Sequence, residues 1–329
     1  MPRRIAVLGT GHALPSRAVT SAELDRQLDR RTGTVERVGG IRVRHFATKD
    51  ETAAMLAAQA ARRALEAAKL SLADIDCLVA ASGTPDQALP CNASLIHREL
   101  GLSGVPAFDI NASCLSFLAA LDTLSWPIMA GRYKRVLVAS ADIASCGLNW
   151  STLESSAIFG DGAAAAVFGP STDGRSRILA VELGTYSEGA DLCRIPGGGS
   201  RYHPSRIDQP FDPLSKFHMD GKGVFKLAAV HLPAFLERLL ARAGVTRDQI
   251  DWVVPHQASQ LAMTHAAKRL GFARDKIVDI FAEHGNQVAA SLPTALDVAI
   301  RDGRIQRGHR LLMLGTGAGL SLGGAVLEY

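Results

Sequence analysis

Aromatic residues are scarce in this sequence, and its cysteines follow no pairing pattern. Only 5% of the 329 residues are Phe, Trp or Tyr, whereas 47% are hydrophobic and 31 are glycine. This balance favours close-packed α/β layers over an aromatic-rich β-sandwich. An odd cysteine count without a CxxC pair argues against both a disulfide framework and a zinc site. The cysteines are Cys77, Cys91, Cys114, Cys146 and Cys193.

Long apolar runs and a strong net charge are also missing. Runs such as Ala163–Phe168 are too short to span a bilayer, and Met1–Ile5 leads into a strand-like segment without the core of a signal peptide. The net charge is only +4, and the basic residues form no stripe interleaved with aromatics. We therefore expect a soluble cytoplasmic protein that binds neither a membrane nor nucleic acid. A local basic patch for an acidic carrier is compatible with this charge.

Motifs for a metal ion or a dinucleotide are absent as well. The histidines form no HxxxH or HxxE pair suited to a metal, so we predict no metal site. Too few residues follow the glycine-rich Gly315–Gly319 for the helix and second strand of a dinucleotide-binding unit, and Gly9–Gly11 does not continue into a glycine fingerprint. A glycine loop can instead present backbone N–H groups to an oxyanion.

Two segments of the chain repeat each other. Residues 61–84 and 235–259 each show the pattern of an amphipathic helix, a short turn and an apolar strand. Ile75 matches Ile250, which is 175 positions further along (250 − 75). An offset of this length is too long for a solenoid repeat. We infer an ancient duplication that produced two similar halves.

The match continues downstream in both copies. A short strand, Val105–Asp109 or Lys276–Ile280, leads through a small-residue turn into a helix, Cys114–Met129 or Val288–Arg301. Each helix is followed by a glycine turn and another apolar strand. Strands that alternate with helices predict parallel or mixed sheets with helical cover, and hence an α/β fold.

The two predicted halves meet at a turn cluster near residue 170. We therefore divide the chain into an N-terminal half, 1–170, and a C-terminal half, 171–329. Residues 186–222 are polar and irregular. We interpret them as an excursion near a substrate entrance, with a plain surface loop as the alternative.

Three residues at strand-to-helix junctions could carry chemistry. Cys114 opens a predicted helix, where the helix dipole should lower the pKa of its thiol below ~8.5. His256 ends an apolar strand, at the edge where open α/β sheets place ligands. Asn286 lies in the turn that the repeat makes equivalent to the turn of Cys114. Each has a structural alternative, namely a buried cysteine, a structural histidine and a capping asparagine. Together they can converge between the halves, as nucleophilic thiol chemistry requires.

Six segments occur in an order typical of one enzyme family. They are FDINASCLSF, IFGDGAAAAV, MDGKGVFK, DWVVPHQAS, EHGNQVAASLPTALDVAIRDGRI and GTGAGLSLGGA, and they cover essentially the whole chain. In these motifs the sequence resembles the 3-oxoacyl-acyl-carrier-protein synthase III family. The resemblance implies a thiolase-like, five-layered αβαβα fold from two pseudo-symmetric halves, an acyltransferase activity and a homodimer. It implies no cofactor beyond the coenzyme A thioester that serves as substrate.

The resemblance also implies a mechanism. The Cys114 thiolate attacks an acyl-CoA primer, and the backbone N–H groups of Cys114 and Ala318 hold the oxyanion. A malonyl thioester then enters, carried by acyl carrier protein (malonyl-ACP) or by CoA (malonyl-CoA). His256 and Asn286 donate hydrogen bonds to its thioester oxygen while CO2 leaves, and the carbanion attacks the acyl-cysteine. The further residues that the resemblance assigns to substrate binding are Arg37, Leu89, Gly221, Phe225 and Ser259.

Several positions depart from the family pattern. The family usually has an asparagine where this chain has Ser259, and a carrier-contacting arginine where it has Leu261. The aromatic and arginine residues that sandwich the CoA adenine have no clear match, and Leu153 or Glu154 stands near the arginine position. These changes favour an unusual primer.

Two other activities stay open from the sequence. Head-to-head condensing thiolases join two acyl-CoAs without decarboxylation and carry a glutamate base where this chain has Leu89, so the missing carboxylate argues against that activity. In the synthase family this position projects from the partner subunit into the acyl pocket. The second alternative is a specialised acyltransferase or a starter-unit ketosynthase, for example one that takes a dicarboxylyl primer.

Overall fold

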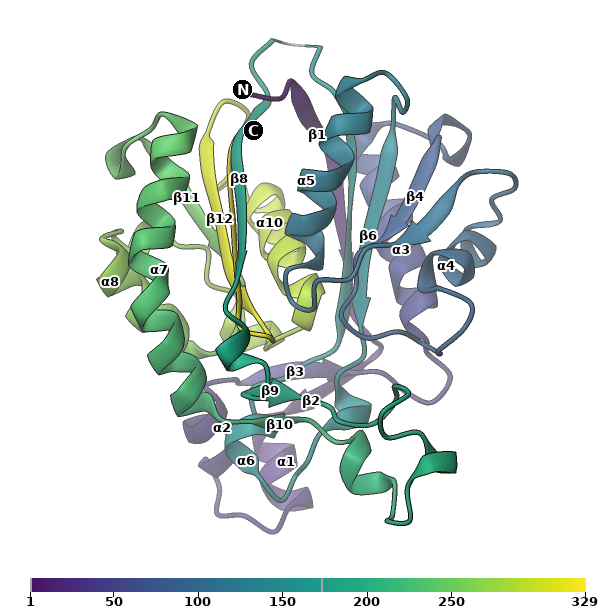
Figure 1. Cartoon of the computed structure of the whole chain (residues 1–329), viewed down its shortest axis with the longest axis vertical. Helices are drawn as coiled ribbons and strands as arrows, with labels where there is room; N and C mark the ends of the chain where they lie inside the picture. The colour runs from purple at the N-terminus through teal and green to yellow at the C-terminus, as the bar shows by residue number, and fades with distance from the viewer. Residues whose placement is uncertain (1, 173) are drawn as a thin grey trace.

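The computed structural model describes residues 2–172 and 174–329, without the side chains of 265–267 and 269. Its strands are β1 (Ile5–Ala13), β2 (Arg17–Thr20), β3 (Val43–Phe46), β4 (Cys77–Ala80), β5 (Ala107–Asp109), β6 (Val136–Asp142), β7 (Gly162–Pro170), β8 (Arg177–Thr185), β9 (Cys193–Arg194), β10 (His218–Met219), β11 (Trp252–Pro255), β12 (Arg310–Gly317) and β13 (Ser321–Glu328). In this part of the chain they form a five-stranded sheet, β1-β7-β6-β4-β5, and a four-stranded sheet, β11-β12-β13-β8 (Figure 1). Two small sheets, β2-β3 and β9-β10, lie below them.

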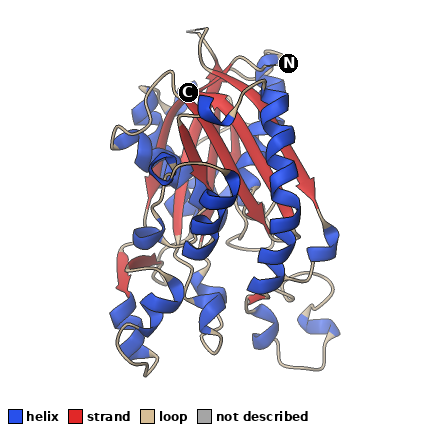
Figure 2. Cartoon of the chain, turned by 90° about the vertical axis from the view of Figure 1, so that its left-hand side faces the viewer, coloured by secondary structure: helices blue, strands red, loops and turns tan. Residues whose placement is uncertain are grey.

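The helices form three layers around the two large sheets. α3 and α4 pack on the outer face of the first sheet, α5 and α10 lie between the sheets, and α7 and α8 cover the outer face of the second (Figure 1). Figure 2 looks onto the outer layer of the second sheet, so that helices lie in front of strands. This arrangement confirms the predicted five-layered αβαβα fold. The helices are α1 (Ser21–Gln27), α2 (Thr34–Gly39), α3 (Ala53–Ala68), α4 (Asn92–Leu100), α5 (Ser116–Met129), α6 (Leu153–Ser156), α7 (Gly221–Ala243), α8 (Gln260–Leu270), α9 (Phe281–His284) and α10 (Ser291–Arg301).

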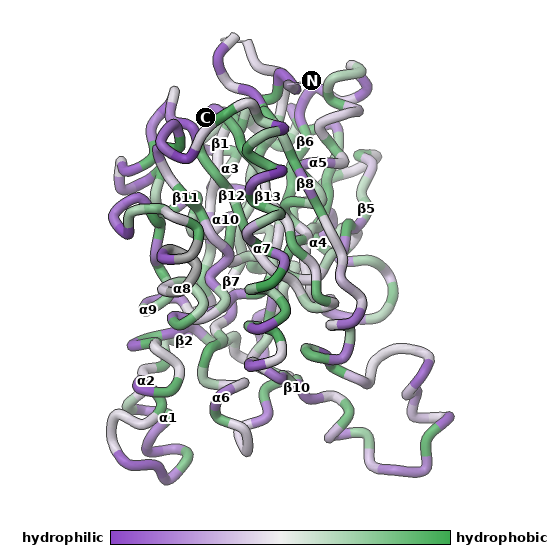
Figure 3. The backbone as a smooth tube through the Cα atoms, turned by 60° about the vertical axis from the view of Figure 1, so that its left-hand side comes forward, coloured by the Kyte–Doolittle hydropathy of each residue, from purple (hydrophilic) through white to green (hydrophobic). Residues whose placement is uncertain are grey.

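The composition of each element explains its layer. α5 is apolar around most of its circumference, and buried residues such as Phe117, Leu118 and Leu121 contact both sheets. A helix of this kind is stable only in the interior. β6 and β7 are buried on both faces, as the middle strands of a covered sheet must be. Figure 3 shows the hydrophobic residues gathered in these inner layers, with hydrophilic residues more frequent toward the periphery.

The two halves of the chain each supply one large sheet. The first sheet ends with β7 at Pro170, and the second begins with β8 at Arg177. The division into halves at residue 170 stays a prediction. Among the described residues, no helix combines the length and hydropathy needed to cross a membrane.

Several predicted element boundaries differ from the structure. The first is minor, because β5 begins at Ala107, two residues after the predicted start at Val105. The predicted strand Lys276–Ile280 is reduced to a single bridge between Ile277 and Val253. The Gln257 side chain takes the place of a strand partner, because its Nε2 donates to the Val278 carbonyl at 3.1 Å and its Oε1 accepts from the Ile280 N–H at 3.1 Å.

The helices after the two equivalent turns also begin later than predicted. α5 starts at Ser116 rather than at Cys114, because residues 112–115 form a tight turn in which Ser113 has a left-handed backbone with φ of 54° and the Leu115 N–H donates to the Ala112 carbonyl. In the second half, Val288–Ala290 form a short 3-10 turn, η8, before α10 begins at Ser291. Val288 has the same left-handed backbone, with φ of 52°. The two helices therefore begin at equivalent positions, Ser116 and Ser291, which lie 175 residues apart.

Candidate active site

A cavity of about 1880 Å³ opens where the two halves meet. Its walls include the turns that follow β4, β5 and β6 in the first half and β11 and β12 in the second, so it lies at the carboxyl ends of these strands. Part of the predicted excursion, 186–222, closes one side through residues such as Cys193, Phe217 and Met219. Ligand pockets typically measure roughly 300–1,000 Å³. This cavity therefore has room for a long substrate.

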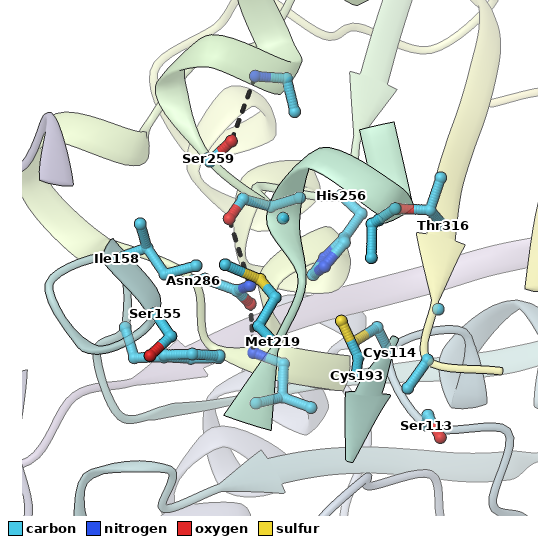
Figure 4. A pocket seen from close by; sticks show the side chains of 18 of the residues that line it. Ser113, Cys114, Ser155, Ile158, Cys193, Met219, His256, Ser259, Asn286 and Thr316 are labelled. Atoms are coloured by element: carbon cyan, nitrogen blue, oxygen red, sulfur yellow. Dashed lines mark hydrogen bonds between the residues drawn. The ribbon is translucent and has the colours of Figure 1, made fainter. Parts of the chain in front are cut away.

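Cys114 lies in the turn between β5 and α5 and lines the cavity. Two hydrogen bonds fix this turn. The Asn111 Oδ1 accepts from the Ser113 N–H at 2.9 Å, and the Ser116 Oγ accepts from the Ala112 N–H at 2.9 Å. The left-handed Ser113 between them turns the chain so that the next side chain, the thiol, faces the cavity (Figure 4).

The ionisation of Cys114 differs from the prediction. The pKa of its thiol is raised to about 12, chiefly by burial and also by the nearby Asp142 carboxylate, while a hydrogen bond from the Ala318 N–H opposes the increase. The predicted lowering of this pKa is therefore wrong. The part of Cys114 that is not buried faces a cavity walled by protein, and the desolvation of the thiolate outweighs the favourable end of α5.

Two backbone N–H groups are directed at the Cys114 sulfur. They belong to Cys114 itself and to Ala318, and their hydrogen bonds favour the thiolate. Ala318 follows the end of β12 at Gly317, in the glycine-rich turn that leads to β13. The two amides come from different halves of the chain. They form a pair of donors that could hold an oxyanion on a group attached to the sulfur.

His256 follows directly on β11 and reaches the same cavity. It is 5% exposed, and burial lowers the pKa of its ring to about 4. The imidazole is therefore neutral at physiological pH. Its Nδ1 is buried without a hydrogen-bond partner among the described residues. β12 can run close to the ring because Gly315 has no side chain, since a Cβ there would lie 2.9 Å from the Cβ of His256.

Asn286 completes the group from the second half. Its Nδ2 donates to the Ala258 carbonyl at 3.3 Å, and its Oδ1 accepts from the Val288 N–H at 2.9 Å. The backbone N–H of Asn286 also donates to the Ile158 carbonyl at 2.8 Å. These contacts fix which end of the amide faces the cavity. The structure thus brings Cys114, His256 and Asn286 together around one space, as Figure 4 shows.

Comparison with known proteins assigns the chain to a family. The family model for 3-oxoacyl-[acyl-carrier-protein (ACP)] synthase III matches residues 108–187, and the model for the C-terminal part of the same enzyme matches residues 240–329. The beta-ketoacyl-[acyl-carrier-protein] synthase III of Rhizorhabdus wittichii is 38% identical over 327 residues, which cover 99% of this chain and 100% of that protein. The chain belongs to the 3-oxoacyl-[acyl-carrier-protein] synthase III family. It is accordingly an acyltransferase.

Solved structures agree with this assignment. The synthase III of Aquifex aeolicus VF5 superposes with a TM-score of 0.89 at 32% identity, over 100% of both chains. The crystal structure of a variant of Xanthomonas campestris OleA superposes with a TM-score of 0.88 at 24% identity, also over 100% of both chains, which shows a common fold alone. These likenesses confirm the predicted thiolase-like fold.

Four of the five residues that the family resemblance assigns to substrate binding line the cavity. Arg37, Gly221, Phe225 and Ser259 belong to its wall. The Ser259 Oγ accepts from the Ala262 N–H at 3.1 Å and thereby caps the first turn of α8 (Figure 4). Leu89 is 84% exposed and does not line the cavity of its own chain. Its predicted place in the pocket of a partner subunit stays a prediction.

Three residues in or next to this cavity were not singled out from the sequence. Lys222 and Cys193 line the cavity, and Asp142 lies beside Cys114 and raises the pKa of its thiol. Lys222 could have been found, because it lies in the MDGKGVFK motif. Cys193 and Asp142 carried no signal, since nothing in the sequence showed that they lie close to Cys114. Within the described residues, no group of three His, Cys, Asp or Glu side chains could hold a metal ion.

Proposed function

We propose that this enzyme condenses an acyl-CoA primer with a malonyl thioester, with loss of CO2, through an acyl-cysteine at Cys114. The malonyl group is carried by acyl carrier protein in this proposal, as the names of the relatives suggest for those proteins. The observation that carries the proposal is the convergence of Cys114, His256 and Asn286 on one cavity, with the Ala318 N–H directed at the sulfur.

In the first half-reaction the Cys114 sulfur attacks the carbonyl carbon of the acyl-CoA. The new S–C bond forms, and the carbonyl oxygen becomes an oxyanion next to the N–H groups of Cys114 and Ala318. The C–S bond to CoA then breaks. The proton of the Cys114 thiol ends on the CoA sulfur, so free CoA leaves and the acyl group stays on the enzyme.

In the second half-reaction the malonyl thioester occupies the space next to His256 and Asn286. The neutral imidazole and the Asn286 amide donate hydrogen bonds to its thioester oxygen. The bond to the carboxylate breaks, CO2 leaves, and the electron pair remains as an enolate held by these donors. The enolate carbon attacks the acyl-cysteine, the 3-oxoacyl thioester departs, and the released Cys114 thiolate takes up a proton from solvent.

The primer that we propose carries an apolar chain longer than an acetyl group. Along α7, the residues Val224, Phe225, Ala228 and Leu232 recur at the spacing of one helix face and line the cavity. They are half-buried, whereas on the later turns of α7 the apolar residues Phe235, Leu236, Leu239 and Leu240 are buried in the core. An acyl chain that lies along this face would remove apolar surface from water.

The proposal is tested by the requirement for malonate. The purified protein is incubated with acyl-CoAs of increasing chain length, with and without malonyl-ACP, and the acyl adduct, CO2 and products are measured by mass spectrometry. We expect an adduct without malonate, but a 3-oxoacyl product and CO2 in equal amounts only when malonate is supplied. A decarboxylative condensation needs no base at the position of Leu89, because loss of CO2 generates the carbanion.

Two outcomes would contradict the proposal. Products with a branched 3-oxoacyl skeleton, or ketones derived from them, formed from acyl-CoA alone would favour head-to-head condensation. Transfer of the acyl group to another acceptor without a new C–C bond would favour a simple acyltransferase. The chain-length series in the same experiment tests the primer, and preference for acetyl-CoA would overturn that part.

A further inference from the structure

The turn that holds Cys114 has a close counterpart in the second half of the chain. In each turn an asparagine Oδ1 accepts from the N–H two residues later, at 2.9 Å in both cases. In each, a serine Oγ accepts from the N–H four residues earlier, and the residue before the cysteine position is left-handed. The matching pairs are Asn111 and Asn286, Ala112 and Gln287, Ser113 and Val288, Cys114 and Ala289, and Ser116 and Ser291, each 175 positions apart.

The two turns differ in what their equivalent amides bind. The N–H of Cys114 is directed at its own sulfur, where the substrate carbonyl would come to lie. The N–H of Ala289, its counterpart, donates to the Asp142 Oδ2 at 3.0 Å, and the N–H of Ala290 donates to the same oxygen at 3.2 Å. A carboxylate of the protein therefore fills, in the second half, the place that the first half keeps for an oxyanion.

Asp142 holds a second turn with its other oxygen. The Oδ1 accepts from the Gly83 N–H at 2.8 Å, the Thr84 N–H at 2.7 Å and the Thr84 Oγ1 at 2.9 Å. The residue is fully buried at the end of β6. One side chain thus joins the turn after β4 to the turn of Asn286, and a Cβ on Gly83 would lie only 2.7 Å from the Val288 side chain between them.

The backbone conformation of Val288 shows why the link that Asp142 makes between these two turns matters. A β-branched residue with φ of 52° is strained, and such a conformation persists only where its surroundings hold it. The surroundings here are the Asn286 Oδ1 on its own N–H and the Asp142 carboxylate on the next two. The orientation of the Asn286 amide depends on this conformation, because the Val288 N–H fixes its oxygen.

We infer that Asp142 is a positioning residue for the condensation step: its carboxylate fills the second-half counterpart of the oxyanion site and thereby sets the Asn286 amide relative to Cys114. This inference rests on the proposed function. It assigns to Asp142 no contact with substrate. It predicts that loss of the carboxylate damages the step that uses Asn286 more than the step that uses Cys114 alone.

The charge of Asp142 provides a second, independent readout. Burial raises the pKa of its carboxyl to about 6, so the group is ionised in a mildly basic assay. In that state it raises the pKa of the Cys114 thiol. Among the residues that the structure describes, the further titratable groups next to the thiol are Cys193 on β9 and His256 after β11 (Figure 4). Removal of the Asp142 charge should therefore make the thiol ionise more easily.

The test is the variant Asp142→Asn. The new amide oxygen can keep the three hydrogen bonds from Gly83 and Thr84, but the amide N–H groups then face Ala289 and Ala290. The hydrogen bonds from these two residues are therefore lost. We expect malonyl decarboxylation to fall at least about tenfold more than self-acylation by acyl-CoA, as for a displaced oxyanion donor. In the same variant, alkylation of Cys114 by iodoacetamide should become faster at a given pH.

Two further variants make the result decisive. Asp297→Asn removes an equally buried carboxylate, bound to Thr10 and Arg301 on α10 and away from the cavity, and should change neither the ratio of the two steps nor the alkylation rate. Thr84→Val removes only one donor from Asp142 and should shift the step ratio in the same direction by less, which decides the question if Asp142→Asn does not fold.

Equal losses in both steps with an unchanged alkylation profile would show that Asp142 is merely structural and would overturn the inference. Failure of the proposed function is distinguishable, because then the wild-type protein itself would form no acyl adduct or release no CO2 from malonate.

Discussion

Asn111 and Asn286 occupy matching places in the two halves, and their side chains accept from the same kind of backbone N–H at the same distance. Their surroundings nevertheless differ. Asn111 is exposed beside the edge strand β5, whereas Asn286 is 6% exposed, hydrogen-bonds the Ala258 carbonyl and lines the cavity next to His256. The local sequence therefore builds the turn, and the neighbouring elements decide whether its side chains meet a substrate.

The residues three positions after the two asparagines also differ. The first turn carries the thiol of Cys114, and the second carries the methyl group of Ala289 at the same place. On the duplication that we infer from the sequence, the chain received two copies of one turn. In our proposal the first copy holds the nucleophile, Cys114, and the second copy supports a hydrogen-bond donor, Asn286. The backbone N–H groups of the second copy bind the Asp142 carboxylate instead of a substrate.

The largest effect is expected from making the first turn resemble the second. Cys114→Ala places at 114 the residue found at 289, and it should abolish acyl-enzyme formation because no other nucleophile lies between the two oxyanion amides. Intact-protein mass spectrometry after exposure to acyl-CoA measures the adduct. A stable adduct in this variant, or one mapped in the wild type to Cys193 or another cysteine, would refute the assignment of the nucleophile.

The second-largest effect is expected from Asn286, with Asn111 as its counterpart in the first half. Asn286→Ala should reduce malonyl decarboxylation by about 10²-fold or more and leave self-acylation of Cys114 in place, since it removes a donor to the enolate oxygen. His256→Ala should behave in the same way. Asn111→Ala is the matched control, because it loses the equivalent hydrogen bond to Ser113 at an exposed site.

We expect Asn111→Ala to change either rate by less than about tenfold, the effect of one ordinary hydrogen bond. The measurements are CO2 release from malonyl-ACP and the rate of adduct formation. Equal loss of both steps in Asn286→Ala would mean that this residue activates the thiol. A large loss in Asn111→Ala would mean that the turn itself, and not its surroundings, carries the effect.

The local order of helices and strands predicted parallel or mixed sheets with helical cover and the convergence of the three site residues, whereas the five layers were predicted from the family resemblance. The 175-residue offset placed Cys114 and Asn286 in matching turns, and the end of an apolar strand placed His256 on the same edge of the sheets. The structure confirms the fold and places all three around one cavity. Their catalytic roles stay predictions until the variants are measured.

What the sequence could not supply depends on contacts between distant segments. The strand predicted at 276–280 fails because the Gln257 side chain takes its hydrogen bonds. Asp142 gave no signal because its importance lies in joining residues 83–84 to residues 289–290, which only the folded chain brings together. The predicted lowering of the Cys114 pKa was wrong for a related reason. A helix end can be recognised in a sequence, whereas the burial of a side chain cannot.

The last prediction concerns the Cys114 thiol. The Asp142 carboxylate binds the second turn and also acts on the nucleophile that the first turn holds. Burial and the Asp142 carboxylate raise the pKa of Cys114 to about 12, so the thiolate is a minor species throughout the range in which the protein is handled. The thiolate is the reactive form, and its fraction increases with pH until the pH reaches the pKa of the thiol. Alkylation of Cys114 by iodoacetamide should therefore increase by about tenfold per pH unit between about pH 7 and about pH 9, without a plateau. The rate is measured by mass spectrometry on the peptide that contains Cys114, with Cys114→Ala as the blank for the other cysteines. A plateau near pH 8 or below would contradict this prediction, because it would mean that the amides of Cys114 and Ala318 and the end of α5 stabilise the thiolate more than burial destabilises it.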